Sequence, residues 1–306
     1  MPELPEVETV RRGLNQVTLN QEIMGGDVLL ERTIAHPFSG DDFLTGLKGT
    51  VITQWHRRGK YLLAELSKSH LEPLNPDSGL QTPELGLKSP GGWLGVHLRM
   101  TGQLLWTDPS VPLQKHTRSR LFFDSGRELR FVDQRTFGQM WWVPPHTPPE
   151  TIITGLQRLG SDPFSPGFTL EYLAGQLKNR RRPIKTALLD QSVVAGMGNI
   201  YADEALFIAG VQPETLCADL NLEQIQRLRG ATIQVLQASI DAGGTTFSNF
   251  LNVQGINGNY GGVAWVYNRT GQACRVCTTP ILRLKLAGRS SHFCPQCQRL
   301  ERRANR

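Results

Sequence analysis

The stretch C-R-V-C at residues 274–277, followed after sixteen residues by C-P-Q-C at residues 294–297, is the most decisive part of this 306-residue sequence. Each C-x2-C pair places two thiolates on one tight turn, and two such turns complete a tetrahedral ligand set. Because protein fills all four positions, the pattern predicts a structural metal site. The spacing favours one zinc ion, with an iron–sulfur cluster as the alternative. The expected ligands are Cys274, Cys277, Cys294 and Cys297.

The region around these cysteines is also the most basic part of the chain. From Thr270 to Arg306 there are eight lysine and arginine residues and one acid, so the stretch carries +7 where the whole chain carries +6. A second basic cluster covers residues 178–185. Basic patches of this kind neutralise phosphates. The pattern therefore indicates a nucleic-acid partner, and Arg289, between the two cysteine pairs, is the expected phosphate contact. A solvated surface is the alternative.

The overall composition excludes several classes of protein. Hydrophobic residues make up 39% and charged residues 20%, which is typical of a chain that forms a core. No apolar run approaches the roughly 20 residues that cross a bilayer, and the start lacks the basic and apolar regions of a signal peptide. We therefore expect a cytoplasmic protein without a membrane partner. In that compartment, five cysteines argue against a disulfide framework, and Cys217, which has no partner in the pattern, is expected to be packed.

The patterning changes along the chain and predicts an α+β protein. Residues 2–142 alternate mainly as strands and form the first expected domain. Four prolines in residues 143–150 predict an extended linker. Residues 151–262 have helical periodicity, and residues 263–306 contain the four-cysteine finger.

Local signals predict individual elements. Val7, Val10 and Leu14 recur at helical spacing behind Pro5, and Gly13 is expected near the end of that helix. Two strands are expected within residues 51–66 and a hairpin within 121–132. Residues 67–92, rich in Ser, Pro and Gly, are expected to form a long surface loop. The expected N-caps of later helices are Thr169 and Asn221.

Five further motifs, together with the cysteines, resemble one family, the bacterial formamidopyrimidine-DNA glycosylases. They are PELPEVETVRRG at 2–13, HRRGKYLL at 56–63, HLRMTG at 97–102, DQRTFG at 133–138 and GMGNIYADE at 196–204. They span nearly the whole chain in the family's order. The resemblance implies an N-terminal β-sandwich with a catalytic N-terminal helix. A helical domain with a helix-two-turn-helix motif and a zinc-ribbon-like hairpin would follow.

The resemblance also implies an activity. Family members are bifunctional enzymes of base excision repair that remove oxidised purines, such as 8-oxoguanine and formamidopyrimidines, from double-stranded DNA and then cleave the strand as AP lyases. It implies that Pro2 is the nucleophile, once Met1 is removed, and that Glu3 is the acid–base residue. An N-terminal proline is a secondary amine, so the iminium that it forms with the sugar stays cationic. Glu6 matches a position that orients the site, or is simply a first-turn carboxylate.

Other matched residues are expected to grip the DNA. Lys60 and Arg289 match catalytic-site residues that hold phosphate beside the lesion, and Asn199 matches a phosphate contact at a helix N-terminus. The void left by the flipped nucleotide would be filled by Met100, Arg135 and Phe137. Core packing is the alternative for Met100 and Phe137. Residues 252–262 resemble a loop that closes over the flipped base, with a flexible linker as the alternative.

Two departures and two rival functions stand beside this interpretation. Thr136 replaces a second basic residue of the family's wedge loop, and residues 67–92 form a longer segment than expected. The rivals are the sister branch that removes oxidised pyrimidines and a catalytically silent damage-binding protein. The PELPEVET start favours the purine branch. We expect a monomer associated with the nucleoid.

Overall fold

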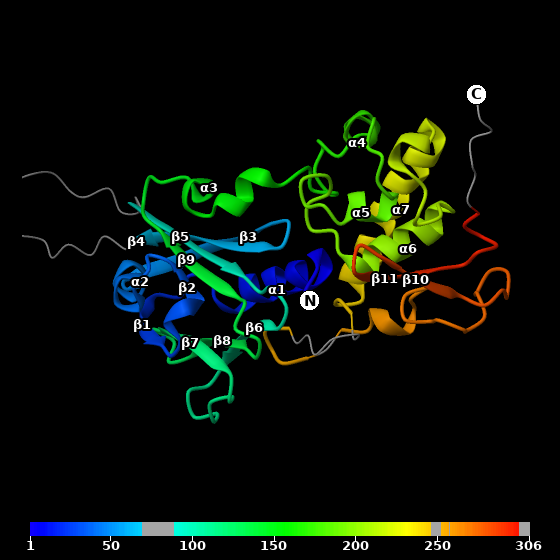
Figure 1. The fold of residues 1–306 in the computed structure, drawn as a ribbon. Helices are drawn as coiled ribbons and strands as arrows, with labels where there is room; N and C mark the ends of the chain where they lie inside the picture. Colours follow the sequence, from blue (N-terminus) through cyan, green and yellow to red (C-terminus); the bar gives the residue numbers. More distant parts are fainter. Residues whose placement is uncertain (69–88, 246–251, 257, 300–306) are drawn as a thin grey trace, which may run out of the picture.

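The chain forms two facing sheets, a helical bundle and a terminal two-stranded hairpin (Figure 1). The structure is a computed structural model, and it describes residues 1–68, 89–245, 252–256 and 258–299. The expected α+β class and the N-terminal β-sandwich are confirmed. In the described part of the chain, no helix combines the length and the apolar character that crossing a membrane requires.

The larger sheet has five strands in the order β2-β9-β5-β4-β3. The strand order places β2 at one edge, and the β2–β9 pair is the parallel one in this sheet. Its strands are β2 (Ile34–His36), β3 (Thr50–Arg58), β4 (Tyr61–Lys68), β5 (Ser89–His97) and β9 (Gln139–Val143). The two expected strands within residues 51–66 are confirmed as β3 and β4, and Gly59 turns between them with a φ of +57° that favours glycine.

The smaller sheet is antiparallel, in the order β1-β7-β8-β6. Its strands are β1 (Ile23–Val28), β6 (Gly102–Thr107), β7 (Thr117–Phe123) and β8 (Glu128–Asp133). The expected hairpin is confirmed as β7 and β8. Alternate side chains of both sheets, such as Leu94 and Leu121, enter one hydrophobic cluster between the sheets. Helix α2 (Gly40–Leu47) packs against β1 and β9.

Helix α1 (Leu4–Val17) joins the sandwich to the rest of the molecule. Val7, Val10 and Leu14 face the sandwich core, as their spacing predicts. Leu4, at the first turn, belongs instead to the core of the helical bundle. The first turn of the chain is therefore fixed between two cores.

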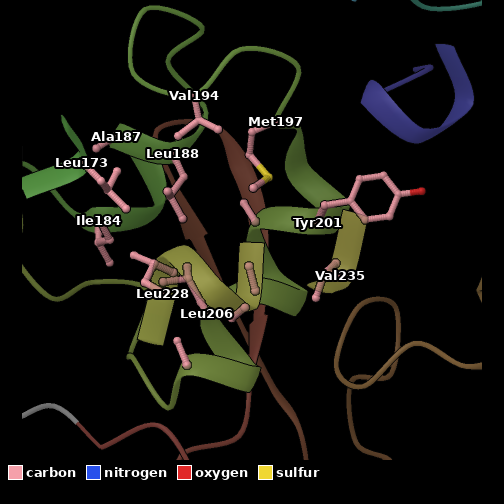
Figure 2. Packing of buried hydrophobic residues seen from close by; sticks show 14 of the residues in the cluster. Leu173, Ile184, Ala187, Leu188, Val194, Met197, Tyr201, Leu206, Leu228 and Val235 are labelled. Carbon is pink, nitrogen blue, oxygen red and sulfur yellow. The ribbon is translucent and has the colours of Figure 1, made fainter. Parts of the chain in front are cut away.

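The helical bundle surrounds the buried helix α6. Figure 2 shows Leu173, Leu188, Met197, Leu206 and Val235 meeting in its core. The bundle helices are α4 (Leu170–Leu177), α5 (Ile184–Leu188), α6 (Asn199–Ala209) and α7 (Leu222–Asp241), and the 3₁₀ turns η3 (Cys217–Asp219) and η4 (Tyr260–Gly262) contribute to the same core. Outside the bundle, η1 (Glu31–Thr33) precedes β2, while α3 (Pro149–Ile152) and η2 (Thr154–Arg158) lie against the larger sheet. The N-caps are confirmed, because Thr169 accepts from the Tyr172 amide and Asn221 from the Gln224 amide.

The terminal hairpin pairs β10 (Leu282–Leu286) with β11 (Arg289–Phe293). Its small core consists of two cysteines, Ile281 and Val266, and it packs against Phe207 of α6. Cys217 lies elsewhere, buried in the helical bundle as expected.

Two local expectations were wrong. The segment 67–92 is not all loop, because β4 extends to Lys68 and β5 begins at Ser89; the remainder of that segment lies outside the described residues. Gly13 does not mark the end of α1, which continues to Val17. Gly13 is instead a point of close approach, where a Cβ would collide with the Val253 side chain. The domain boundaries expected at 142, 150 and 262 stay predictions.

Candidate active site

The start of α1 lies against the start of α6. Pro2 and Glu3 are buried, and the Leu4 amide donates to the Gly196 carbonyl at 3.1 Å. The Glu3 carboxylate accepts from the Ile200 amide at 3.2 Å, so it caps the first turn of α6 across the interface. Within the described residues its second oxygen, Oε2, has no hydrogen-bond partner although it is buried. A carboxylate oxygen is thus free beside the first residues of the chain.

Burial changes the acidity of this carboxyl. Removal from water raises the pKa of Glu3 to about 7, while the charge of Lys60 opposes the rise. Burial also lowers the pKa of the amine at Met1, against the opposing effects of Glu3 and Glu6. At neutral pH Glu3 is therefore able to exist in both protonation states, which suits a group that transfers protons.

Lys60 follows Gly59 in the β3–β4 turn and is only 7% exposed. Burial lowers the pKa of its ammonium group, and the charge of Arg289 lowers that pKa further, while Glu3 raises it. The charges of Glu3 and Arg289 thus both act on the ammonium group of Lys60. The fold therefore brings Glu3, Lys60 and Arg289 together from three distant parts of the sequence.

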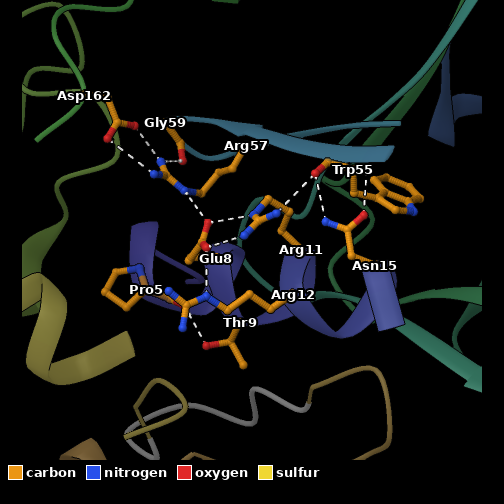
Figure 3. A network of polar contacts seen from close by, with 10 residues as sticks. All are labelled: Pro5, Glu8, Thr9, Arg11, Arg12, Asn15, Trp55, Arg57, Gly59 and Asp162. Atoms are coloured by element: carbon orange, nitrogen blue, oxygen red, sulfur yellow. Dashed lines mark hydrogen bonds and ion pairs between the residues drawn. The ribbon is translucent and has the colours of Figure 1, made fainter. Parts of the chain in front are cut away.

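A polar network holds the Lys60 turn in place (Figure 3). The Arg57 guanidinium donates to Glu8 of α1 at 3.1 Å and to Asp162 at 2.6 Å. Arg57 is 8% exposed at its side chain, so its two ion pairs are shielded from solvent. The network connects the sandwich, α1 and the segment that leads into the helical bundle.

Glu6 is fully buried and accepts three hydrogen bonds. One oxygen accepts from the Glu3 amide at 2.8 Å and completes a capping box; the other accepts from the Tyr201 hydroxyl at 2.6 Å and the Thr245 amide at 2.9 Å. The Tyr201 hydroxyl also contacts that of Ser239 at 2.5 Å. Glu6 is therefore more than a favourable first-turn charge, because it ties the backbone of Glu3 to α6 and α7.

The expected wedge residues lie on two neighbouring loops. Met100 and Phe137 are 37% and 52% exposed, so core packing does not explain them. The Arg135 guanidinium lies over the Phe137 ring at 5.0 Å, and Arg135 also lowers the pKa of the N-terminal amine. Asp133 joins the loops, since it accepts from the Thr101 hydroxyl and from the Arg135 amide at 3.2 Å.

Asn199 begins α6, as expected for a helix N-terminus. Its buried Oδ1 has no hydrogen-bond partner among the described residues. Four residues later, Asp203 forms a buried ion pair with Lys185 at 2.6 Å and accepts from the His292 amide of β11 at 2.9 Å. The hydrogen bond from His292 to Asp203 fixes β11, which begins with Arg289, against α6, which begins with Asn199.

The four expected ligand cysteines meet at one point. Their sulfur atoms lie within 4.8 Å of one another, with separations of 3.9 Å for Cys274–Cys297, 3.4 Å for Cys277–Cys294 and 3.5 Å for Cys277–Cys297. Zn–S bonds of about 2.3 Å give tetrahedral S···S separations of about 3.8 Å. The cluster therefore fits one structural zinc ion, with no ligand position left open for chemistry.

Three contributors were not among the sequence-predicted site residues. His97 lines a hollow beside Lys60, and burial lowers its pKa to about 3, which keeps the ring neutral. Asp133 and Tyr201 lie within recognised motifs, but their partners are visible only in three dimensions. Residue 257 of the expected base-closing loop, 252–262, lies outside the described residues. Arg302, Arg303 and Arg306 also lie outside them.

Comparison with known proteins identifies each part of this arrangement. Residues 1–140 match the formamidopyrimidine-DNA glycosylase N-terminal domain, residues 159–250 match the H2TH domain of that enzyme, and residues 271–300 match the zinc finger found in FPG and IleRS. Fold, buried carboxyl and zinc cluster together define the chain as a DNA glycosylase of base excision repair.

Whole-chain relatives agree. A formamidopyrimidine-DNA glycosylase of a Nostoc species is 69% identical over 97% of this chain and 100% of its own, and that of Nostoc punctiforme is 68% identical over 100% and 99%. An Fpg of Lactococcus lactis in complex with DNA containing an abasic site superposes with a TM-score of 0.82 at 30% identity, covering 97% of this chain and 99% of the other. The chain belongs to the formamidopyrimidine-DNA glycosylase family.

Gly198 offers a test of the α1–α6 junction. An added Cβ would overlap the Glu3 carboxyl group, so Gly198→Ala is expected to displace that group and lower single-turnover excision by about 100-fold. Gly175→Ala is the control, since its added Cβ would meet no described residue within 4 Å beyond its chain neighbours and the backbone of its own helix. Equal activity of the two variants in a single-turnover assay would show that the junction does not position Glu3.

The zinc cluster makes a second prediction. Cys294→Ser is expected to reduce the metal content from one zinc per chain to near zero and to expose residues 271–299 to proteolysis. Cys217→Ala, at a cysteine outside the cluster, should retain the metal. Elemental analysis and limited proteolysis measure both effects. Full zinc content in Cys294→Ser would contradict the assignment.

Proposed function

We propose that this chain is a bifunctional glycosylase and AP lyase that excises oxidised purines from duplex DNA through its N-terminal proline. The observation that carries the proposal is the buried Glu3 carboxyl, with a pKa of about 7 and a free oxygen, beside the first residues of the chain. The structures of relatives support it. Lactococcus lactis Fpg has been solved with DNA containing an abasic site and with DNA containing Fapy-dG.

Pro2 is the proposed nucleophile, and removal of Met1 frees its amine. The nitrogen attacks C1′ of the damaged nucleotide, the bond from C1′ to the base breaks, and the base departs with a proton. Ring opening leaves an iminium between Pro2 and the sugar. Because this secondary-amine iminium cannot lose an N–H proton, it acidifies the C2′ proton; successive β- and δ-elimination then expel the two phosphates.

Glu3 is the proposed proton donor. Its free oxygen protonates the ring oxygen of the sugar as the ring opens, which requires the neutral carboxyl. Burial makes that form available near pH 7. Glu6 positions the Glu3 backbone and does not itself transfer a proton.

Lys60, Asn199 and Arg289 are the proposed phosphate contacts. Lys60 and Arg289 supply positive charge, and Asn199 lies at the first turn of α6, where backbone amides favour an anion. Their common attachment to a rigid frame, through Arg57 and Asp203, supports this assignment, because phosphate contacts set the register of the DNA.

Met100, Arg135 and Phe137 are proposed to enter the duplex. Extrusion of a nucleotide costs a few kcal/mol of stacking and pairing, and inserted apolar side chains recover part of it. The exposure of Met100 and Phe137 supports this role. Arg135 then hydrogen-bonds to the orphaned cytosine. We further propose that the enzyme acts as a monomer in the cytoplasm, associated with the nucleoid.

The Glu3 assignment predicts a pH dependence. The neutral acid is the active form, so the single-turnover rate should fall as the pH rises above about 7, the pKa of Glu3. Glu3→Gln should lower the rate by about 10²- to 10⁴-fold and abolish this alkaline decline. An unchanged alkaline midpoint in Glu3→Gln would assign the decline to another group.

The Pro2 assignment predicts a covalent adduct. Borohydride added during reaction with an 8-oxoguanine:C duplex should trap the protein on DNA, and peptide mapping by mass spectrometry should locate the adduct on Pro2. Protein with an acetylated N-terminus should give none and should not cleave the strand. Cleavage by the acetylated protein would refute the nucleophile. A thymine glycol duplex is tested in parallel. Excision of thymine glycol in preference to 8-oxoguanine would assign the protein to the branch that removes oxidised pyrimidines.

A further inference from the structure

A second hollow lies at the β2 edge of the larger sheet, beyond the residues assigned above. We call it the edge hollow; it measures about 560 Å³. Its wall includes residues from η1, the chain after β2, the start of β9 and the segment around η2. The residues used below are Arg32, Phe38, Arg99, Gln139 and Trp141.

The charge of the edge hollow is positive and unopposed. Among the residues that the structure describes, Arg32 and Arg99 are the charged residues that line it, and no carboxylate does. Arg99 donates to the Gln139 side chain at 2.9 Å, a neutral partner. Arg32 is exposed and has no ion pair or hydrogen bond through its side chain within the described residues. The hollow therefore presents two guanidinium groups to an anionic ligand.

Phe38 stands beside these charges with 91% of its surface exposed. Its ring contacts that of His36 edge-on, with centroids 6.3 Å apart, and this contact leaves most of the ring accessible to solvent. An aromatic ring in water next to arginines that have no carboxylate partner among the described residues suits a ligand with alternating apolar and anionic groups. A sugar–phosphate backbone has that alternation, because deoxyribose presents C–H groups between phosphates.

The edge hollow adjoins the catalytic region. Tyr61, Arg99 and Gly155 line both it and the hollow of about 400 Å³ that contains Lys60 and His97. The two hollows therefore share a wall, so a strand held by Lys60 lies next to the edge hollow.

We propose that the edge hollow binds the sugar–phosphate backbone of undamaged duplex on one side of the lesion, with Arg32 on a phosphate and Phe38 against a deoxyribose. This inference rests on the proposed function and extends it, since it assigns a contact outside the damaged nucleotide. The positive charge and the shared wall with the Lys60 hollow favour DNA over a protein partner.

The test measures the affinity of Arg32→Gln and Phe38→Ala for duplexes that carry a tetrahydrofuran abasic analogue. One duplex has two long arms, and two others have either arm shortened to a few base pairs. Each variant should bind the long duplex about fivefold more weakly than wild type. Arg32→Gln should also reduce the slope of log Kd against log salt by about one. Both defects should disappear on one of the shortened duplexes, because that duplex no longer reaches the hollow.

Matched controls separate this effect from loss of charge or apolar surface in general. Lys48→Gln removes one exposed charge from the end of α2, next to the end of β3 opposite the Lys60 turn. Leu222→Ala removes a 64% exposed apolar side chain from α7. Both should bind all three duplexes as wild type does.

Two results would overturn the inference. One is wild-type affinity in both edge-hollow variants, and the other is a defect of equal size on all three duplexes. In either case wild-type protein that still cleaves an 8-oxoguanine duplex leaves the proposed function intact. Wild-type protein that neither binds nor cleaves damaged DNA would refute the proposed function itself.

Discussion

The first turn of α1 is shared by two hydrophobic cores, and the rest of the site depends on this constraint. Leu4 packs in the helical bundle, whereas Val7, only three residues later, packs between the sheets. A helix rises about 1.5 Å per residue, so the two cores meet within one turn. The chain's first residues consequently have no freedom to fray, although termini are usually the most mobile part of a protein. A terminal amine can act as a precise reagent only under such a restriction.

The electrostatics of the site follow from the same burial. Glu3 and Glu6 are both removed from water, which raises the pKa of each carboxyl. The two carboxyl groups differ in their hydrogen bonds. Glu6 has its oxygens satisfied by three donors, so it acts as a structural anchor. Glu3 keeps one oxygen unpaired. Two neighbouring carboxyl groups on one helix thereby acquire separate tasks, one of holding the backbone and one of exchanging a proton.

Much of this was predictable from the sequence, and the failures have physical causes. The cysteine spacing determined the metal cluster, because tetrahedral geometry leaves few alternatives, and the caps Thr169 and Asn221 are local signals. Gly13 was misjudged because its reason is contact with Val253, which is remote in sequence. The extension of β4 to Lys68 was missed because pairing with β5 overrides a polar composition. The bond between Glu6 and Tyr201 spans 195 positions and has no signature in either segment.

The terminal hairpin has a small core that it does not complete by itself. Phe207 of α6 contributes a side chain to it, stacked on Trp265 at a centroid distance of 5.6 Å, and Asp203 on the same helix holds the hairpin's second strand. Zinc fingers in tandem arrays are independent modules, because each contains its own hydrophobic core. This finger is not an independent module, because Phe207 of α6 forms part of its core. Grafting it onto another scaffold would require transplanting the matching face of α6 as well, so the two segments are expected to evolve as one unit.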